Sequence, residues 1–290
     1  MTNVQTGLRA DEAAVRALAA RAEQVDQVAP LDEATLLALG HDARAVHLTA
    51  HDDGRLVGYA QVRADGDGWV GELVVDPDQR RRGTGTALLA AARAETGGPL
   101  EVWAHGDLPA AQALLAAVGA RPVRELWMLG RDLAGLPAPA APPPGVTLRP
   151  FRVGEDEAAW LAVNARAFAH HPEQGRTTLA DLLVREREPW FDAEGFVLAV
   201  TDDGTLLGSV WTKVQPGVGE IYVLGVDPAA QGMGLGRVLT GAGLGYLAGR
   251  GLGRVVLFVE SDNDAALATY RTAGFVREAV HTRYRLPGLG

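Results

Sequence analysis

The sequence lacks cysteine altogether and contains a single lysine, Lys213, among its 290 residues. Without cysteine there can be no disulfide, no thiolate metal ligand and no cysteine nucleophile to carry an acyl group. The chain is rich in Ala, Gly and Arg, a bias under which exposed lysines tend to be replaced by arginine. A lysine retained against this bias is a candidate for a function that needs its compact ammonium head.

Positive charge and long apolar runs are also scarce. The formal net charge is −9 at pH 7, whereas a nucleic-acid partner would require a basic face. Nowhere do about 18 apolar residues run together, and residues 1–20 contain no apolar stretch of the signal-peptide kind. We therefore expect a cytoplasmic protein with no nucleic-acid or membrane partner, whose acidity suits a cationic small substrate. No residues have the spacing of a metal site, so no metal is expected.

An internal repeat is the strongest pattern in the chain. DGRLVG at 53–58 reappears as DGTLLG at 203–208, and Asp-Gly between apolar runs is typical of a β-hairpin turn. Each copy continues with the tripeptide VDP and then with a glycine-rich run that opens a helical pattern, RRRGTG at 80–85 and QGMGLG at 231–236. The offset stays near about 150 residues throughout, so we interpret the chain as two copies of one domain.

The boundary between the copies is a proline-rich segment. Residues 135–145 read GLPAPAAPPPG, which can neither hold a helix nor pair in a sheet. We predict a semi-rigid linker there, an N-terminal domain at 1–134 and a C-terminal domain at 146–290. In the second copy we expect strands at 146–151, 196–214 (a hairpin), 220–226, 255–260 and 276–286, and helices at 155–167, 178–186, 237–250 and 264–273. This mixture predicts an α/β (α+β) fold, with a mixed, mostly antiparallel sheet flanked by helices in each domain.

A strand, then Q/R-x-x-G-x-G, then a helix is an arrangement suited to holding a diphosphate. Glycines let the backbone approach the phosphate oxygens, and the N–H groups at the helix N-terminus face the negative charge. Neither run ends in Gly-Lys-Ser/Thr, so these are not nucleoside-triphosphate loops. Neither is the Gly-x-Gly-x-x-Gly fingerprint of dinucleotide-binding folds.

This pattern resembles the pyrophosphate loop of the GCN5-related N-acetyltransferases (GNAT), and the resemblance covers nearly the whole chain, twice. It implies acetyl-CoA as cosubstrate, with the strand before each loop pairing with the pantetheine arm. By position, the cofactor-binding residues of the N-terminal copy are Leu73, Val74, Val75, Arg81, Arg82, Gly83, Thr84, Gly85 and Thr86. Those of the C-terminal copy are Leu224, Gly225, Val226, Gln231, Gly232, Met233, Gly234, Leu235, Gly236, Arg237, Asn263, Asp264, Ala265, Ala266, Leu267 and Ala268.

The last helix distinguishes the two copies. NDAALATY at 263–270, leading to Gly274, resembles the family block whose tyrosine protonates the departing CoA thiolate, a catalytic role that falls on Tyr270. Aligned on the glycine, the N-terminal copy has Leu115 at this place, and leucine cannot donate a proton. We expect the N-terminal copy to bind acetyl-CoA without catalysis. The alternative for Tyr270 is an ordinary core tyrosine.

A general base is also required, because an attacking ammonium must first lose a proton. Glu220 is the candidate. Side chains alternate along a strand, so Glu220 would share one face with Tyr222, Leu224 and Val226, beside the track of the pantetheine. The alternative is an idle charge at a strand start. Attack would be direct, since no cysteine can carry the acetyl group, and strand N–H groups would polarise the carbonyl.

A closer resemblance is to the mycothiol synthase family. It is carried by HPEQG at 171–175, GEIYVLGVDP at 219–228 and ESDN at 260–263. That family is a tandem of two such domains with an active C-terminal one, and it acetylates the cysteinyl amine of cysteinyl-glucosaminyl-inositol in the last step of mycothiol biosynthesis. By position, the implied substrate contacts are Glu33, Glu173, Lys213 and Glu220. Phe258 departs from the pattern, because the family commonly has a tyrosine there.

Two other functions stay open from the sequence. One is acetylation of a different amine, such as an aminoglycoside, a polyamine or a protein N-terminus, because a fold does not fix a substrate. The other is a non-catalytic acetyl-CoA sensor, against which the tyrosine and the carboxylate argue. Two copies in one chain form a pseudo-dimer, so we expect a monomer.

Overall fold

The computed structural model describes residues 3–7, 9–41, 45–169 and 174–288. The chain divides into two compact units: unit 1 comprises Met1–Leu126 and Val280–Gly290, and unit 2 comprises Trp127–Ala279. In each unit a mixed sheet lies between helices, which confirms the predicted α/β (α+β) class. Among the described residues, no helix is long and apolar enough to cross a membrane.

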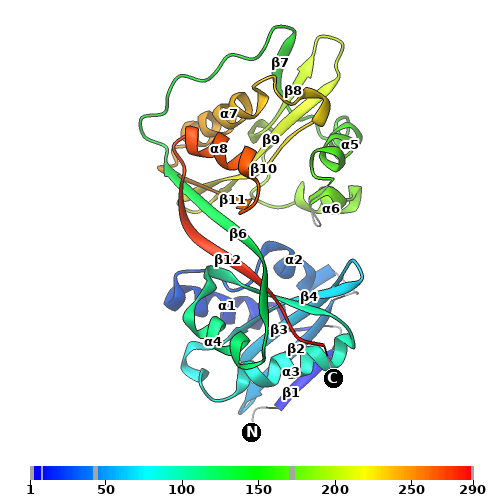
Figure 1. The fold of residues 1–290 in the computed structure, drawn as a ribbon, viewed down its shortest axis with the longest axis vertical. Helices are drawn as coiled ribbons and strands as arrows, with labels where there is room; N and C mark the ends of the chain where they lie inside the picture. Colours follow the sequence, from blue (N-terminus) through cyan, green and yellow to red (C-terminus); the bar gives the residue numbers. More distant parts are fainter. Residues whose placement is uncertain (1–2, 8, 42–44, 170–173, 289–290) are drawn as a thin grey trace. The chain divides into compact units, whose positions relative to one another are not determined.

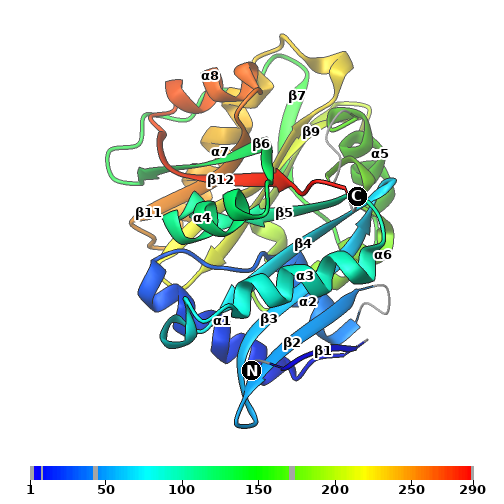
Figure 2. The same cartoon turned by 60° about the horizontal axis from the view of Figure 1, so that its bottom comes forward.

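Unit 1 contains a sheet with the strand order β1-β2-β3-β4-β5-β12. Its strands are β1 (Asn3–Gly7), β2 (Val46–Asp52), β3 (Arg55–Asp65), β4 (Gly68–Val75), β5 (Leu100–Ala104) and the end of β12 (Val276–Arg285). Helices α1 (Glu12–Asp26) and α2 (Glu33–His41) cover one face, and α3 (Thr84–Thr96) and α4 (Pro109–Ala117) cover the other. Figure 2 shows α3 lying across β2, β3 and β4.

Unit 2 repeats this plan with the strand order β6-β11-β10-β9-β8-β7. Its strands are the end of β6 (Arg121–Asp132), β7 (Val146–Pro150), β8 (Phe196–Thr201), β9 (Leu206–Gln215), β10 (Val218–Val226) and β11 (Arg254–Glu260). Helices α5 (Glu157–Ala167) and α6 (Leu179–Arg185) lie on one side of the sheet, and α7 (Leu235–Gly249) and α8 (Asp264–Thr272) lie on the other (Figure 1). These bounds confirm the predicted elements of the second copy to within about two residues.

Local sequence signals account for several of these boundaries. The repeated Asp-Gly turns place Gly54 and Gly204 at φ values of 79° and 85°, a conformation that glycine adopts without strain. Thr178 begins α6 with a capping box, in which its side chain and that of Asp181 each accept a backbone N–H. Asn263 begins α8, where its side chain accepts the N–H of Ala266.

The two copies exchange their last strands, which the sequence did not predict. Strand β12 ends in unit 1, where it pairs with β5 from Thr282↔Ala104 to Arg285↔Glu101. Strand β6 instead leaves the N-terminal copy and supplies Leu129 to the core of unit 2. The predicted boundaries at 134 and 146 therefore differ from the compact units. The last strands of two copies of one domain occupy equivalent positions, so their side-chain pattern does not reveal which sheet each one joins.

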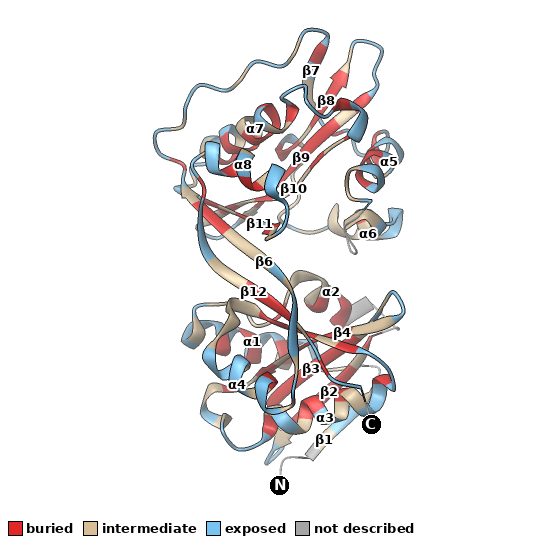
Figure 3. Ribbon diagram, viewed as in Figure 1, coloured by how far each residue is buried: buried red, intermediate tan, exposed pale blue. Residues whose placement is uncertain are grey.

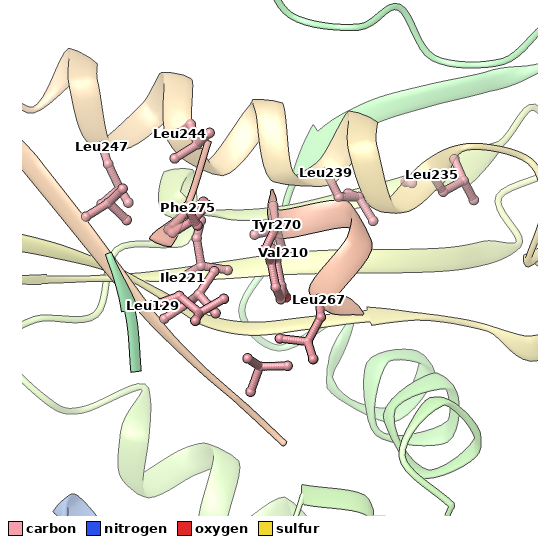
Figure 4. Close-up of a cluster of buried hydrophobic side chains, with 14 of the residues drawn as sticks. Leu129, Val210, Ile221, Leu235, Leu239, Leu244, Leu247, Leu267, Tyr270 and Phe275 are labelled. Atoms are coloured by element: carbon pink, nitrogen blue, oxygen red, sulfur yellow. The ribbon is translucent and has the colours of Figure 1, made fainter. Parts of the chain in front are cut away.

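The core of unit 2 has two parts, one on each face of the sheet. On the α7 side, leucines of α7 pack with Ile221, Tyr270 and Phe275, as Figure 4 shows. On the α5 side, the core is dominated by stacked and edge-on aromatic rings, including Phe196 and Trp211, whose centroids lie 4.5 Å apart. Most residues of β9, between these layers, are buried, and buried residues are red in Figure 3. We name these two sides the α7 face and the α5 face.

Candidate active site

The candidate site of unit 2 lies where β10 and β11 separate. The two strands pair in parallel from Gly219↔Val255 to Ile221↔Leu257. Strand β10 then continues to Val226 and stays paired with β9 on its other side. A strand edge that has left its neighbour can hydrogen-bond an extended ligand in the neighbour's place. The predicted cofactor-binding residues 224–226 lie on this stretch.

A β-bulge at Tyr222 marks the start of the separated stretch. Ile221 pairs with Thr212 and Val223 pairs with Trp211, so Tyr222 is an extra residue in β10. A bulge of this kind redirects the side chains and the backbone N–H groups that follow it.

The bulge corrects the prediction that Glu220, Tyr222, Leu224 and Val226 share one face. Ile221, Leu224 and Val226 contact the core on the α7 face, whereas Tyr222 contacts the aromatic core on the α5 face. Glu220 precedes Ile221, so alternation puts it on the α5 face with Tyr222. The extra residue reverses the alternation. Even-numbered side chains therefore lie on the α5 face before the bulge and on the α7 face after it.

The glycine-rich run after β10 forms a loop and the first turn of α7, as predicted. Gly232 and Gly234 adopt positive φ values of 84° and 80°. Gly234 is the N-cap of α7, and no side chain caps the helix there. The first N–H groups of α7 therefore have no side-chain cap and follow a loop in which two of the four residues are glycine, which fits a diphosphate.

The aspartate of the VDP motif stabilises the start of this loop. Asp227 accepts hydrogen bonds from the N–H of Ala229 at 2.9 Å and from Arg166 at 2.5 Å. These two contacts hold the pKa of Asp227 below its usual value. In unit 1, Asp76 likewise accepts the N–H of Asp78 and the side chains of two arginines. The repeated motif thus has a structural role at both loops.

Tyr270 lies on α8, on the α7 face. Its side chain is 7% exposed and meets the ring of Phe275 edge-on at 5.8 Å. Burial raises the pKa of Tyr270 to about 12, so the hydroxyl is protonated at neutral pH. Tyr270 and Glu220 therefore lie on opposite faces of the unit 2 sheet. The separated stretch of β10 runs between these two faces.

The other predicted cofactor residues of unit 2 gather at the ends of α7 and α8. Residues 264–268 form the first turns of α8, behind the cap made by Asn263. Arg237 and Ala268 line a cavity of about 630 Å³ between the two helices and the segment 136–140. The equivalent cap in unit 1 is Leu108, which makes no side-chain hydrogen bond to α4.

Lys213 and Glu220 are direct cross-strand partners in β9 and β10, so their side chains share the α5 face. The Lys213 side chain is buried, at 7% exposure. Its ammonium nitrogen lies 4.8 Å from the ring centre of Trp190 and 5.4 Å from that of Tyr222. The sequence indicated Lys213 and Glu220 but not Trp190, because Trp190 follows α6 and is distant in sequence from both strands.

The remaining predicted substrate residues are distributed differently. Phe258 alternates with Leu257 and Val259, which pack on the α7 face, so its 41% exposed ring lies on the α5 face with Glu220. Glu33 belongs to unit 1, in the first turn of α2. Glu173 lies outside the described residues.

Unit 1 contains a cavity of about 560 Å³ where its strands β4 and β5 separate, the place that corresponds to the separation of β10 and β11 in unit 2. Strands β4 and β5 pair only from Trp69↔Leu100 to Gly71↔Val102 and then separate. The cavity is lined by the ends of both strands, the glycine loop and α4; its walls include all the predicted cofactor-binding residues of this copy except Arg82, namely Leu73, Val74, Val75, Arg81, Gly83, Thr84, Gly85 and Thr86.

Two features of unit 2 are missing from this cavity. The β3–β4 register runs from Asp65↔Gly68 to Gly58↔Val75 without a shift, so the described strand β4 has no bulge there. Leu115 lines the cavity where the alignment places Tyr270 in unit 2. Unit 1 thus keeps a cavity whose walls contain most of the predicted cofactor-binding residues, and it has a leucine at the place of Tyr270.

A buried histidine pair, which was not predicted from the sequence, adjoins this cavity, and His105 is part of the cavity wall. His105 is hydrogen-bonded to Glu72 at 2.7 Å and to His281 of β12 at 2.9 Å. Burial opposes charging of His105, but the Glu72 carboxylate outweighs burial and raises the pKa of His105. Burial, aided by the charge on His105, lowers the pKa of His281 to about 4. We infer that His105 is the charged member of the pair.

The free energy of unfolding is therefore expected to fall as the pH falls from 6.5 towards 4. Folded His281 stays neutral in this range, whereas its unfolded form takes up a proton below about 6.5, so acid favours the unfolded chain. The full effect is about 3 kcal/mol. Urea unfolding across this pH range measures it. The variant His281→Gln should flatten the acid limb, and an equal slope in both proteins would refute this assignment.

No group of three or more His, Asp or Glu side chains that could hold a metal ion occurs in the part of the chain that the structure describes.

Comparisons with known proteins agree with this geometry. The acetyltransferase (GNAT) family model matches residues 161–275, and an acetyltransferase (GNAT) domain model matches residues 43–119. The chain is similar to the mycothiol acetyltransferase of Cellulomonas flavigena, with 53% identity over 95% of this chain and 86% of that protein. It is also similar to the mycothiol acetyltransferase of Thermomonospora curvata, with 52% identity over 94% and 93% of the two chains.

Solved structures resemble the chain over its full length. A GCN5-related N-acetyltransferase from Sphaerobacter thermophilus has a TM-score of 0.70 and 26% identity, covering 99% of this chain and 97% of that one. A tandem GNAT protein from the clavulanic acid biosynthesis pathway has a TM-score of 0.73 and 21% identity, covering 99% of both chains, and shares the fold. The two repeated units are GNAT domains, and the chain belongs to the mycothiol acetyltransferase family of acetyl-CoA-dependent N-acetyltransferases.

Proposed function

We propose that this protein transfers the acetyl group of acetyl-CoA to the cysteinyl amine of cysteinyl-glucosaminyl-inositol, the last step of mycothiol biosynthesis, and that unit 2 performs the transfer. The observation that carries the proposal is the separated, bulged strand β10, with the Glu220 carboxylate on one face and the Tyr270 hydroxyl on the other. Unit 1 has the separated strand, but its strand β4 has no bulge and leucine stands at the place of Tyr270.

Acetyl-CoA supplies an activated acyl group. The residues of unit 2 would bind acetyl-CoA and transfer the protons that the reaction requires. The loop at 231–237 and the N-terminus of α7 would bind the diphosphate, and the edge of β10 beyond the bulge would hydrogen-bond the pantetheine arm. An N–H of this edge would also polarise the thioester carbonyl. Together these contacts would hold the thioester carbonyl carbon beside the α5 face, where the amine would enter.

In the reaction the attacking nitrogen loses two protons and the sulfur gains one. Glu220 would accept the first proton of the substrate ammonium, directly or through a water, so that the neutral amine can attack the carbonyl. As the carbon–sulfur bond breaks, the Tyr270 hydroxyl, which is protonated at neutral pH, would donate its proton to the departing thiolate. The second proton of the nitrogen leaves as the amide forms and returns through water to the tyrosine oxygen, which restores the hydroxyl. Direct attack is supported by the absence of cysteine, because no thiol is available to carry the acetyl group.

The α5 face supplies charge for substrate recognition. Glu220 would hold the ammonium, and Lys213 would donate hydrogen bonds to hydroxyl oxygens of the sugar or inositol. Phe258 offers a ring face without the hydroxyl of the family tyrosine, and the family resemblance assigns Glu33 and Glu173 to the substrate as well.

In unit 1, we propose that the cavity retains acetyl-CoA without turnover. Gly83 and Gly234 are matched N-caps of α3 and α7, with φ values of 84° and 80°. Valine at such a φ is strained and would place its side chain where a diphosphate must approach. We expect calorimetry to give two acetyl-CoA sites per chain, and one site for either Gly83→Val or Gly234→Val. A single site in the wild-type protein that Gly83→Val leaves intact would refute binding in unit 1.

The substrate is tested by following acetylation of a panel of amines by mass spectrometry. Mass detection is needed because the proposed substrate carries a thiol that would disturb a colorimetric assay of released CoA. We expect cysteinyl-glucosaminyl-inositol to gain one acetyl group on nitrogen with the highest kcat/KM. A higher value for an aminoglycoside, a polyamine or a peptide N-terminus would replace the proposed substrate, and no acetylation with acetyl-CoA bound would favour a sensor.

A further inference from the structure

The single lysine of the chain is held against aromatic rings. The Lys213 ammonium lies over the face of Trp190 at 4.8 Å and near the face of Tyr222 at 5.4 Å. The two rings contact each other at a centroid distance of 5.2 Å and an angle of 59°. Together they form two walls of the niche that contains the ammonium group.

Ring faces suit this position because they attract a cation and restrict where it can go. The negative face of an indole or phenol ring stabilises an ammonium within about 6 Å, most strongly when the charge is shielded from water. Lys213 is such a case, since its side chain is 7% exposed. A long, flexible side chain that would otherwise sample many rotamers is thereby held in one place.

The Tyr222 wall is itself anchored. Arg185, in the last turn of α6, donates a hydrogen bond from Nε to the Tyr222 hydroxyl at 2.7 Å and another from its guanidinium to the carbonyl of Asp181 at 3.0 Å. Trp190 follows α6 and contacts Trp211 of the aromatic core at 5.7 Å. Both walls are thus fixed by α6 and the segment after it, on the face where Lys213 lies opposite Glu220.

We propose that Trp190 and Tyr222 are positioning residues that clamp the Lys213 ammonium opposite Glu220, with Arg185 locking the Tyr222 wall through its hydroxyl. In the proposed reaction, which this inference extends, the clamp would set the distance between the cation that binds substrate hydroxyl oxygens and the carboxylate that receives the amine. Tyr222 thus has two roles in this proposal, because the bulge at this residue redirects the cofactor-binding edge that follows, while its own ring stays on the α5 face beside the lysine.

The clamp can be tested directly because the chain has one lysine. Labelling lysine at the ε-carbon gives a single NMR signal, and ring currents shift a group held over an aromatic face upfield of its position in the urea-unfolded chain. We expect an upfield signal in the wild-type protein, loss of most of the shift in Trp190→Leu, and retention of much of it in Trp190→Phe. Phe191→Leu is the matched control, because Phe191 belongs to the same aromatic core and meets Trp211 edge-on at 5.9 Å.

The Arg185 lock is tested by Tyr222→Phe, which keeps the ring and removes the hydroxyl that Arg185 binds. A smaller upfield shift is expected. An unchanged signal in Tyr222→Phe would overturn the lock, and an unshifted signal in the wild-type protein would overturn the clamp. Thermal unfolding of each variant verifies that the protein is folded when its signal is recorded.

Kinetics then separate positioning from a general loss of structure. Trp190→Leu should raise KM for the amine about tenfold, with kcat and the KM for acetyl-CoA nearly unchanged. In a Lys213→Met background the same substitution should have no further effect, because there is no ammonium left to position. An equal rise in KM in both backgrounds would overturn the clamp. Failure of the proposed reaction would be seen as no acetylation, with the NMR signal still shifted.

Discussion

Replacing Tyr270 by phenylalanine should lower kcat by about 10² to 10⁴, the range expected when one positioned acid is removed. The phenyl ring keeps the buried contacts with Phe275 and the α7 face, so only the proton donor is lost. Rapid mixing with mass detection of the acetylated amine measures the effect.

The affinity for acetyl-CoA is the control for Tyr270→Phe. Calorimetry should give an affinity close to that of the wild-type protein, because the proposed diphosphate and pantetheine contacts come from the loop and from β10. A kcat within about threefold of wild type would remove Tyr270 from the mechanism and leave it a core residue, since a lost catalytic acid costs far more than that.

Replacing Glu220 by glutamine should also lower kcat/KM for the amine by about 10² to 10⁴. Glutamine keeps the size and one hydrogen-bond acceptor but cannot take a proton from an ammonium at neutral pH. The loss should shrink as the pH rises, because more of the amine is then deprotonated in solution and needs no base. The pH dependence of kcat/KM for the variant is the measurement.

Glu155→Gln is the matched control for Glu220→Gln, because it removes an exposed carboxylate from the turn before α5, where Glu155 pairs with Arg152 at 3.5 Å, and leaves the site unchanged. Its kinetics should match those of the wild-type protein. A Glu220→Gln variant whose deficit is constant from neutral to alkaline pH would contradict the base assignment and would indicate a role in holding the substrate.

Much of the fold follows from local signals in the sequence. The Asp-Gly turns, the VDP strand ends and the glycine runs predicted both copies because each depends on backbone conformation that few other residues adopt. The helix of Asn263 and Tyr270 was predicted to within about one residue, since a side-chain cap and a periodic apolar face are both local features.

The features that were not predicted depend on contacts between distant segments. Alternation along β10 gave the wrong face for Leu224 and Val226 because one bulged residue, Tyr222, reverses the pattern and leaves no local mark in the sequence. The exchange of β6 and β12 is invisible to patterns shared by both copies. The Lys213–Trp190 contact and the Glu72–His105 bond join segments whose separation in sequence hides them.

In the proposed function, the bulge marks where the two copies of one domain differ. Unit 1 and unit 2 share the separated strand pair and the glycine loop. They differ at β4 and β10, where one has continuous register and the other an extra residue, and at Leu115 and Tyr270. We propose that the shared parts bind acetyl-CoA in both units and that the differing parts confine catalysis to unit 2.

The central claim is that unit 2 performs the transfer, and the matched loop variants test it most directly. Acetylation of cysteinyl-glucosaminyl-inositol by the Gly234→Val and Gly83→Val variants is followed by mass spectrometry. All proteins are assayed at the same acetyl-CoA concentration, one that saturates the wild-type protein. We predict that Gly234→Val loses nearly all activity, whereas Gly83→Val keeps a kcat close to that of the wild-type protein. Loss of activity in Gly83→Val together with full activity in Gly234→Val would contradict the account and move the chemistry to unit 1.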